Sequence, residues 1–406
     1  MPRSAPTRYA ERSLAPPLRI GFLSAHNYFS ENAYSSALLR MYRALQATPA
    51  EVVPLGAPYR VTTWSRATRR LRDACGVPRA VDDRFRSRGA EFRRVVTKQL
   101  AHQRCDVLVA PVASHEIEWL KPDLPVIYAS DVTYRVYAPM YGLAPTEADD
   151  RIEQHAIDRA AAIAYSSEWA ADSARKDYGA RPDKVLVVPF GANLPDAPDP
   201  ALAEQRVLTK PLRLLFLGKE WERKGGPLVL QTVTELRHRG VETHLVIAGC
   251  TPPNVASGAG VEVIPYLDKT FAADRQRMHE LWRDSHLFFM PTRAEAFGMV
   301  FCEAAAYGLP AVTTAVGGVP SAVAAGESGL VLPLAATATD YAEAICQLLS
   351  RPAEYSAIAR GARRRYEQVL NWSAWGERVY DIALQVAERR VAERTAQAEA
   401  LAHVGQ

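Results

Sequence analysis

Two glutamates stand eight residues apart in a stretch whose other groups suit a phosphorylated ligand. The stretch PTRAEAFGMVFCEAAAYGLP runs from Pro291 to Pro310 and carries Glu295 and Glu303, with Phe297-Gly298 between them. The apolar run SHLFFM precedes it and AVTTA follows it, and both have the composition of buried strands. The predicted order is therefore strand, loop, helix, strand.

This order places both carboxylates beside the start of one helix. Glu295 falls in the loop at the carboxyl end of the strand, and Glu303 falls about a turn and a half into the helix. Backbone N–H groups of Gly298, Met299 and Val300 are then free of helix partners, and the helix dipole is positive at this end. Such a terminus suits a phosphate group, so one carboxylate is placed to hold a sugar and the other a ribose.

A second polar loop follows the strand pattern RLLFLG. It runs from Gly218 to Gly226, GKEWERKGG, and leads into the helical pattern PLVLQTVTELRHRG. Lys219 and Lys224 in this loop stand where a strand ends, facing the same crevice as the glutamates. Solvent exposure is the common state of loop lysines, but the two closing glycines favour contact with a ligand.

These motifs, taken in order, resemble a known family. The run E-A-F-G-M-V-F-C-E, then G-L-P, then Gly317-Gly318-Val319-Pro320, is similar to the nucleotide-binding half of the retaining glycosyltransferases of family 4 (group 1). The resemblance implies an α/β protein of the GT-B fold, with two Rossmann-like parallel-sheet domains facing a cleft and a C-terminal helix that crosses back to the first domain.

The domain boundaries are predicted from composition. Pro195 to Ala203, PDAPDPALA, is short, polar and rich in proline, as linkers tend to be. We expect an N-terminal acceptor-side domain at 1–200, a nucleotide-sugar-binding domain at 201–370, and the returning helix at 371–406. Strands of continuous Val, Ile, Leu and Ala alternate with helices in both halves, which indicates parallel sheets covered on both faces.

The resemblance also assigns roles to residues. It implies catalytic roles for Glu295, Lys224, Lys219 and Asp131, with Glu295 on the donor sugar, Glu303 on the ribose and the lysines on the diphosphate. Lys219 replaces the family's usual arginine, keeping the charge but losing the planar fork. Asn193 and Ser321 replace a usual Asp and a usual Glu. The donor-binding residues implied are Gly218, Arg223, Phe297, Gly298, Met299, Val300, Glu303, Tyr266, Leu267, Gly317 and Gly318.

In the first half, a polar and aromatic loop follows the strand LRIGFLS. The family usually has paired glycines there, whereas this chain has other polar residues. Open α/β sheets bind ligands at this end of a strand, although Asn and Ser side chains also cap loops. Both readings stay open for the candidate acceptor-side residues His26, Asn27, Glu31 and Asn32.

Asp131 follows the strand PVIYAS, at a position where many family members have a histidine. An ionised carboxylate accepts hydrogen bonds and donates none. Asp131 is therefore suited either to accept from a sugar hydroxyl, with its charge near the reacting sugar, or to cap the turn through the N–H of Thr133.

Composition narrows the class of protein. The chain has 406 residues, 48% apolar residues, a net charge of +4 and no run long enough to span a membrane. The five cysteines form no C-x-x-C pair and indicate neither disulfides nor a zinc site. We expect a cytoplasmic protein that does not bind nucleic acid. The arginine-rich stretch 60–94 is either a solvated face or a peripheral contact with the inner face of a membrane.

The predicted reaction is transfer of a hexose from a nucleoside diphosphate sugar to a glycan, lipid or small-molecule acceptor. Retention of configuration is implied by the resemblance. Neither a metal nor a cofactor is expected, because the sequence has no Asp-x-Asp pair and a lysine about 4 Å from the leaving group contributes roughly 4 kcal/mol at a dielectric near 20. Alternatives are a sugar-nucleotide epimerase, a phosphorylase, and a non-catalytic partner or regulator of the same fold. A dehydrogenase is disfavoured, since no G-x-G-x-x-G follows a first strand.

Overall fold

The computed structural model of the chain describes residues 17–26, 33–56, 89–121, 123–253, 255, 257–258, 260–268 and 271–404. Three of the candidate acceptor-side residues, Asn27, Glu31 and Asn32, lie outside these ranges. So does the arginine-rich stretch up to residue 88. The remaining candidate site residues are all described.

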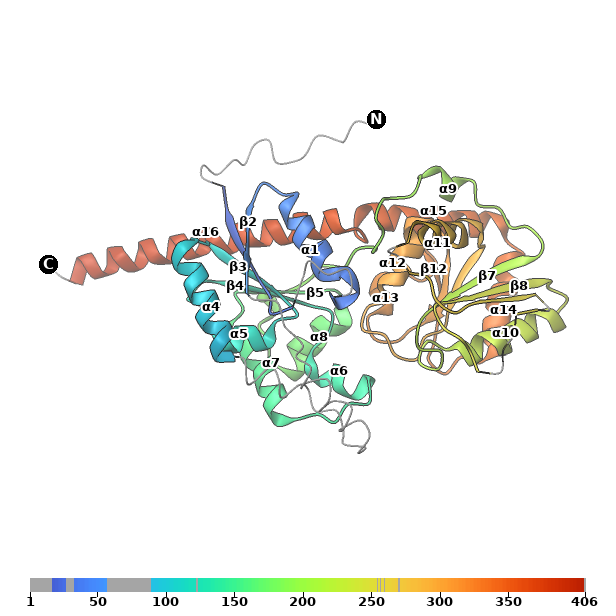
Figure 1. Ribbon diagram of the computed structural model, residues 1–406, viewed down its shortest axis with the longest axis horizontal. Coiled ribbons are helices and arrows are strands. Elements are labelled where there is room, and N and C mark those ends of the chain that lie inside the picture. Colours follow the sequence, from blue (N-terminus) through green and yellow to red (C-terminus); the bar gives the residue numbers. More distant parts are fainter. Residues whose placement is uncertain are drawn as a thin grey trace. The chain divides into compact units, whose positions relative to one another are not determined.

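The chain forms two compact units, each built on its own sheet. The first unit comprises Met1–Val188 and Trp375–Gln406, and the second comprises Pro189–Ala374. Blue to green ribbon marks most of the first unit and yellow to orange ribbon most of the second (Figure 1). The chain thus enters the second unit at Pro189, before the proline-rich stretch, and leaves it at Ala374.

The first unit contains a six-stranded parallel sheet in the order β2-β1-β3-β4-β5-β6. The central strands are fully buried, as the apolar runs in the sequence predict. Because β1 lies between β2 and β3, the strand order reverses at β1 and β3, which is where such sheets bind ligands. The strands are β1 (Arg19–Leu23), β2 (Glu51–Leu55), β3 (Val107–Pro111), β4 (Val126–Ser130), β5 (Ala162–Tyr165) and β6 (Val185–Val187).

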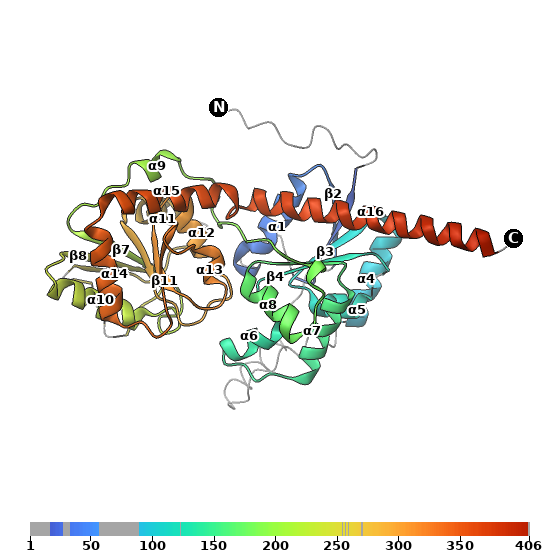
Figure 2. The ribbon, with the colours of Figure 1, turned by 180° about the vertical axis from the view of Figure 1, so that it is seen from behind.

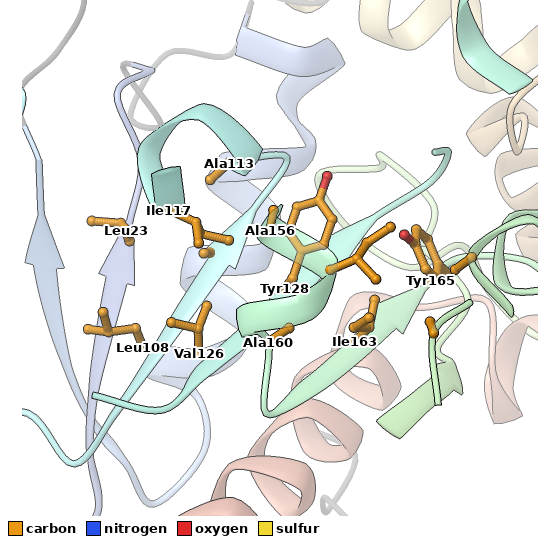
Figure 3. Close-up of a cluster of buried hydrophobic side chains, with 14 of the residues drawn as sticks. Leu23, Leu108, Ala113, Ile117, Val126, Tyr128, Ala156, Ala160, Ile163 and Tyr165 are labelled. Carbon is orange, nitrogen blue, oxygen red and sulfur yellow. The ribbon is translucent and has the colours of Figure 1, made fainter. Parts of the chain in front are cut away.

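Helices cover the sheet of the first unit. Side chains of β1, β3, β4 and β5 pack together with Ile117 and Ala156 from two covering helices, as Figure 3 shows. Ser167 caps α8, since its side chain accepts a hydrogen bond from the N–H of Ala170. The helical segments are η1 (Ala33–Ser36), α1 (Ala37–Gln46), α4 (Gly89–His102), α5 (Ser114–Leu120), α6 (Tyr134–Met140), α7 (Glu147–Arg159), α8 (Glu168–Asp177) and η2 (Pro182–Lys184).

The second unit contains another six-stranded parallel sheet, in the order β12-β11-β10-β7-β8-β9. Its first strand, β7, lies between β8 and β10, so the strand order reverses at β7 and β10. The strands are β7 (Leu212–Leu217), β8 (Thr243–Ala248), β9 (Val261–Ile264), β10 (Leu287–Met290), β11 (Ala311–Thr314) and β12 (Gly329–Leu332).

Helices lie on both faces of this sheet, with α11 and α15 on one side and α10 and α14 on the other (Figures 1 and 2). They are α9 (Ala201–Glu204), α10 (Gly226–His238), α11 (Ala272–Asp284), α12 (Met299–Ala306), α13 (Val319–Ala322), α14 (Ala338–Leu349) and α15 (Pro352–Gln368). The long helix α16 (Trp372–Val404) follows. From Trp375 onward it belongs to the first unit, where a Cβ added to Gly376 would lie 2.7 Å from the carbonyl oxygen of Ala44 on α1.

Two buried arginines hold the carboxyl end of α12. Arg206 donates to the carbonyl of Tyr307 (3.0 Å) and Arg363 to that of Ala306 (2.6 Å). Cations at this end complement the helix dipole and satisfy carbonyl groups that lack a partner in the helix. Both arginines are therefore expected to stabilise the helix that follows Glu295.

Among the described residues, no cluster of three or more His, Cys, Asp or Glu side chains is arranged to hold a metal ion. Nor does the described part of the chain contain a helix with the length and apolar character needed to cross a membrane.

Candidate functional site

The two polar loops predicted to carry chemistry meet at the point where the strand order of the second sheet reverses. Strands β7 and β10 are hydrogen-bonded neighbours, with Leu214 beside Leu287. The loop from Gly218 to Gly225 follows β7, and the loop that carries Glu295 follows β10. Parallel α/β sheets bind ligands outside the carboxyl ends of such strands.

Two glycines let the loop after β7 approach its neighbours closely. Gly225 has a φ of 80°, and a Cβ added there would lie 2.0 Å from the carbonyl oxygen of Pro291. A Cβ on Gly226 would lie 2.2 Å from the ring of Trp221, which is buried against Phe216. Only glycine fits both positions, so the two glycines that end GKEWERKGG are required for the contact between the two loops.

Arg223 joins these loops. Its guanidinium donates to both carboxylate oxygens of Glu220, each at 2.8 Å, and to the carbonyl of Ala294 at 2.6 Å. Its own carbonyl accepts from the N–H of Arg293 at 2.8 Å. The hydrogen bond from Arg223 lowers the pKa of the Glu220 carboxyl. Arg223 therefore fixes the position of the loop that carries Glu295, a role that its predicted assignment to donor binding does not include.

Lys224 and Glu295 form an ion pair at the centre of the site. The Lys224 ammonium donates to Oε2 of Glu295, and Nη1 of Arg223 lies 3.9 Å from the same oxygen. The side chains of Lys224 and Glu295 are only 13% and 10% exposed. Two cations thus share one carboxylate in a largely buried environment, where charges interact more strongly than at the surface.

A third loop, after β11, also reaches Glu295. The N–H of Gly318 donates to the carbonyl of Glu295 at 3.2 Å, and Gly317 has a φ of 53°. On the other side, Gly298 has a φ of 87°, and a Cβ there would lie 3.1 Å from Cγ of Glu295. The predicted glycines therefore surround Glu295 and leave room beside its side chain.

Helix α12 begins directly after Gly298, as predicted. Its first residues, Met299 and Val300, are half-buried, and Phe297 before it is buried against Phe190 with ring centroids 5.6 Å apart. The helix has no side-chain cap at this end. Glu295, the partner of Lys224, precedes the first residue of α12 by four positions. A helix N-terminus with a cation beside it suits an anionic ligand.

The second glutamate of the motif is placed differently from the first. Glu303 is the fifth residue of α12 and is 5% exposed. Burial, followed by the charge of Glu303, raises the pKa of Tyr307 to about 12. Glu303 is therefore a buried residue within α12, the helix that follows Glu295.

Other predicted donor-binding residues lie at the rim of the second unit. Lys219 opens the loop after β7 and is exposed. Tyr266 and Leu267 follow the edge strand β9, and Tyr266 is 62% exposed. The loops after β9, β8 and β7 run in sequence along this edge, since the N–H of Gly249 donates to the carbonyl of Ile264 at 3.0 Å and a Cβ on Gly249 would lie 3.3 Å from the carbonyl oxygen of Gly218.

The carboxyl edge of the first sheet carries a separate set of polar groups. Asp131 accepts a hydrogen bond from the hydroxyl of Tyr34. Glu116, which is buried on α5, accepts from the N–H of Ala25 at 3.1 Å, and burial raises the pKa of its carboxyl to about 7. Burial also lowers the pKa of His26. Within the described residues, this edge therefore combines Asp131 and His26 with two groups that the sequence did not single out.

Nothing in the sequence marked Tyr34 or Glu116 as candidate site residues. Tyr34 lies 97 positions from its partner Asp131, and Glu116 lies 91 positions from Ala25. Tyrosine in a loop and glutamate in a helix are common, and neither stands in a motif. Only the folded sheet brings each beside its partner.

Comparison with known proteins assigns the second unit to a family. Residues 211–351 match the family model described as Glycosyl transferases group 1. The chain is also 27% identical over 301 residues to a D-inositol 3-phosphate glycosyltransferase of Corynebacterium aurimucosum, a match that covers 67% of this chain and 70% of the relative. Across similar proteins of that name, the match spans from 48% to 72% of the relative's length.

Solved structures share the architecture of the chain. A sucrose-phosphate synthase from Thermosynechococcus elongatus has a TM-score of 0.66 at 17% identity and covers 91% of this chain and 99% of its own. The Anabaena protein HepE in complex with UDP-glucose has a TM-score of 0.59 at 15% identity and covers 92% of this chain and 100% of its own.

The protein has the fold of the GT-B glycosyltransferases, and the predicted fold class is confirmed. Its residues 211–351, which include Lys224 and Glu295, form a group 1 glycosyl transferase domain. The resemblance read from the glutamate motif and the glycine-rich loops is confirmed as well. The family assignment thus concerns the second unit, whose residues 211–351 match the group 1 glycosyl transferases.

Proposed function

We propose that the protein transfers a hexose from a nucleoside diphosphate sugar to an acceptor hydroxyl, with retention of configuration and without a metal ion. The observation that carries this proposal is the Lys224–Glu295 pair, which lies where the strand order reverses and next to the first residues of α12. An anionic group and a polyhydroxy group are the two ligands that this pair is suited to hold side by side.

The diphosphate is the natural partner of Lys224. The bond between the anomeric carbon and the diphosphate oxygen breaks, the nucleoside diphosphate leaves with the electron pair, and the acceptor oxygen bonds to the same carbon as it loses its proton. Negative charge grows on the leaving oxygen, and a cation already in place stabilises that charge without rearrangement. Exposed Lys219 at the start of the same loop supplies a second cation.

Glu295 is assigned to the hydroxyls of the donor sugar. Once the diphosphate takes the Lys224 ammonium, the carboxylate is released to accept hydrogen bonds from the sugar. Glu303 is assigned to the ribose hydroxyls, and Gly317 and Gly318 let the backbone approach the sugar. The donor sites of the neighbours support this class of ligand, since HepE is described in complex with UDP and with UDP-glucose.

The acceptor is proposed to bind at the carboxyl edge of the first sheet. Similar proteins are named for transfer to D-inositol 3-phosphate, which makes a cyclic polyhydroxy compound the first acceptor to test. We propose only the class of the acceptor, and not the particular compound, because the match spans only part of each relative.

Donor binding is tested with a thermal-shift panel of UDP, GDP, ADP and their hexose conjugates. A ligand specific to the folded state, present at 100 times its dissociation constant, adds about 2.7 kcal/mol of stability. Transfer is then followed as release of nucleoside diphosphate with D-inositol 3-phosphate, myo-inositol or glucose as acceptor, and product NMR reports the anomeric configuration. Binding without release in the presence of every acceptor would favour a non-catalytic protein, and release that needs no acceptor would favour an epimerase or hydrolase.

Two substitutions separate the assigned roles. Lys224→Ala is expected to act mainly on kcat, because the ammonium meets charge that develops as the diphosphate leaves. Glu303→Ala is expected to raise KM, because ribose is held equally in the ground and transition states. Glu235→Gln, which changes an exposed pair on α10 with side chains about one-third exposed, is the control and should leave both constants unchanged.

A further inference from the structure

Tyr34 and Asp131 meet across the carboxyl edge of the first sheet. Tyr34 lies in η1, after β1, and Asp131 directly follows β4, with β3 between those strands. The Tyr34 hydroxyl nevertheless donates to Oδ1 of Asp131. Among the described residues of the two loops no backbone hydrogen bond joins them, so this side-chain hydrogen bond connects them.

The backbone at this edge is held in an unusual conformation. Tyr34, Ser36 and Val112 all have positive φ, at 50°, 66° and 52°. Val112 directly follows β3 and is β-branched, which makes a left-handed conformation costly. Strain of this kind is retained where surrounding contacts over-determine it, and it concentrates at functional sites.

Tertiary contacts hold the described residues on each side of positions 27–32. Before them, buried Glu116 accepts from the N–H of Ala25 at 3.1 Å. After them, the Tyr34 hydroxyl donates to Asp131. The position of the phenol ring is therefore specified by a tertiary contact with the turn after β4.

The direction of the hydrogen bond is determined by the chemistry of the phenol. Burial, followed by the charge of Asp131, raises the pKa of Tyr34 well above its usual value. Tyr34 stays protonated over the physiological range and acts as a donor. The same charge, after burial, also raises the pKa of Tyr137 on α6.

The turn after β4 has side-chain support from another residue. The Ser130 hydroxyl donates to the carbonyl of Val132 at 2.9 Å and lies 3.4 Å from its N–H. The turn that carries Asp131 is therefore bound locally by Ser130, while Asp131 itself points to a phenol from a distant loop.

We propose that Tyr34 is a positioning residue that orients the Asp131 carboxylate to accept a hydrogen bond from a hydroxyl of the acceptor. This inference rests on the proposed transfer reaction and adds the residue and the acceptor group on the first unit. A carboxylate has about four acceptor positions, so Asp131 is able to accept from Tyr34 and from a ligand hydroxyl at the same time. Since like charges repel, the acceptor group beside Asp131 is a neutral hydroxyl and not a phosphate.

The test uses the full-length chain and the acceptor that gives transfer in the panel above. Tyr34→Phe, Asp131→Asn and the double variant are compared for acceptor kcat/KM, donor KM and UDP, GDP or ADP affinity. A hydrogen bond to a charged group contributes enough that Tyr34→Phe should lower acceptor kcat/KM by about 10- to 100-fold. In the Asp131→Asn background the same change should have less than about a twofold effect, because the hydroxyl acts through the carboxylate.

Tyr42→Phe is the matched control. It removes a hydroxyl on α1 that accepts from Gln46 at 3.3 Å, and it should leave all constants unchanged. Equal losses from Tyr34→Phe in both backgrounds, no loss at all, or an equal change in donor affinity would each overturn the proposal. Should Asp131→Asn abolish transfer, the comparison of acceptor and donor constants in Tyr34→Phe alone decides. Failure of the unmodified chain to transfer would instead refute the proposed function.

Discussion

Replacing Glu295 by glutamine is expected to change protein stability and nucleotide affinity in opposite directions. Glu295 compensates the charge of Lys224 and lies 3.9 Å from Arg223. Glutamine keeps the shape but removes the charge. The protein should become less stable because Lys224 loses its anion and Arg223 keeps only Glu220. A diphosphate should bind more tightly because it no longer competes with the carboxylate of Glu295.

The magnitude follows from burial and distance. Breaking a buried pair costs about 3–5 kcal/mol, and with side chains 13% and 10% exposed we expect about 3 kcal/mol for Glu295→Gln. Lys224→Met should cost only about 1–2 kcal/mol, since Arg223 remains near the carboxylate, and two charges about 4 Å apart attract by about 4 kcal/mol at a dielectric near 20. The order of the two losses is therefore a prediction of the geometry.

The affinity for the diphosphate should distinguish Glu295→Gln from Lys224→Met further. If about a third of the attraction between Lys224 and Glu295 becomes available to the ligand, Glu295→Gln should bind the diphosphate about tenfold more tightly. Lys224→Met loses a charge-assisted hydrogen bond and should bind it about 10- to 100-fold more weakly. The double variant should resemble Lys224→Met, because the glutamate acts on affinity through the lysine.

Denaturant unfolding gives the stabilities, and titration calorimetry with the nucleoside diphosphate selected in the thermal-shift panel gives the affinities. Glu235→Gln is the control for loss of one carboxylate, since exposed helix pairs contribute only about 0.3–0.5 kcal/mol. Unchanged or weaker binding by Glu295→Gln, together with normal binding by Lys224→Met, would refute the assignment of Lys224 to the diphosphate.

Three further predictions concern pH, backbone and metal. Burial raises the pKa of Glu116 to about 7 from its usual 4.5. The stabilisation by the protonated form is therefore complete below about pH 4.5 and is lost as the pH rises through 7. Glu116→Gln should remove about 3 kcal/mol of pH dependence in denaturant unfolding between pH 4.5 and 8. Gly225→Ala should lower Tm and weaken diphosphate binding, because the added Cβ would lie 2.0 Å from the Pro291 carbonyl oxygen. Gly240→Ala is the control. Gly240 has a φ of 78° and open space around it, so this change should cost only about 1–2 kcal/mol of stability. Transfer should keep full rate in excess EDTA, and a rate restored only by Mg²⁺ or Mn²⁺ would contradict the lysine-based mechanism.

Local sequence determined the elements of this protein and the loops that carry its chemistry. Short continuous apolar runs bounded by turn residues are typical of strands buried on both faces, so β3, β4 and β5 were foreseeable. Glycines with positive φ at Gly225 and Gly298 mark turns that other residues adopt at a cost. Because parallel strands present their carboxyl ends at one edge, the loops of Lys224 and Glu295 were expected to lie close together, and the ion pair between these residues shows that they do.

Tertiary structure alone decided how those groups are paired. Lys224 and Glu295 are 71 positions apart, and their ion pair depends on β7 lying beside β10. Arg223 connects two loops, and Tyr34 orients toward Asp131, through contacts that span as many as 97 positions. A residue type shows which bonds a side chain is able to make, but the choice of partner depends on which strands become neighbours, and that is settled by the packing of the whole sheet.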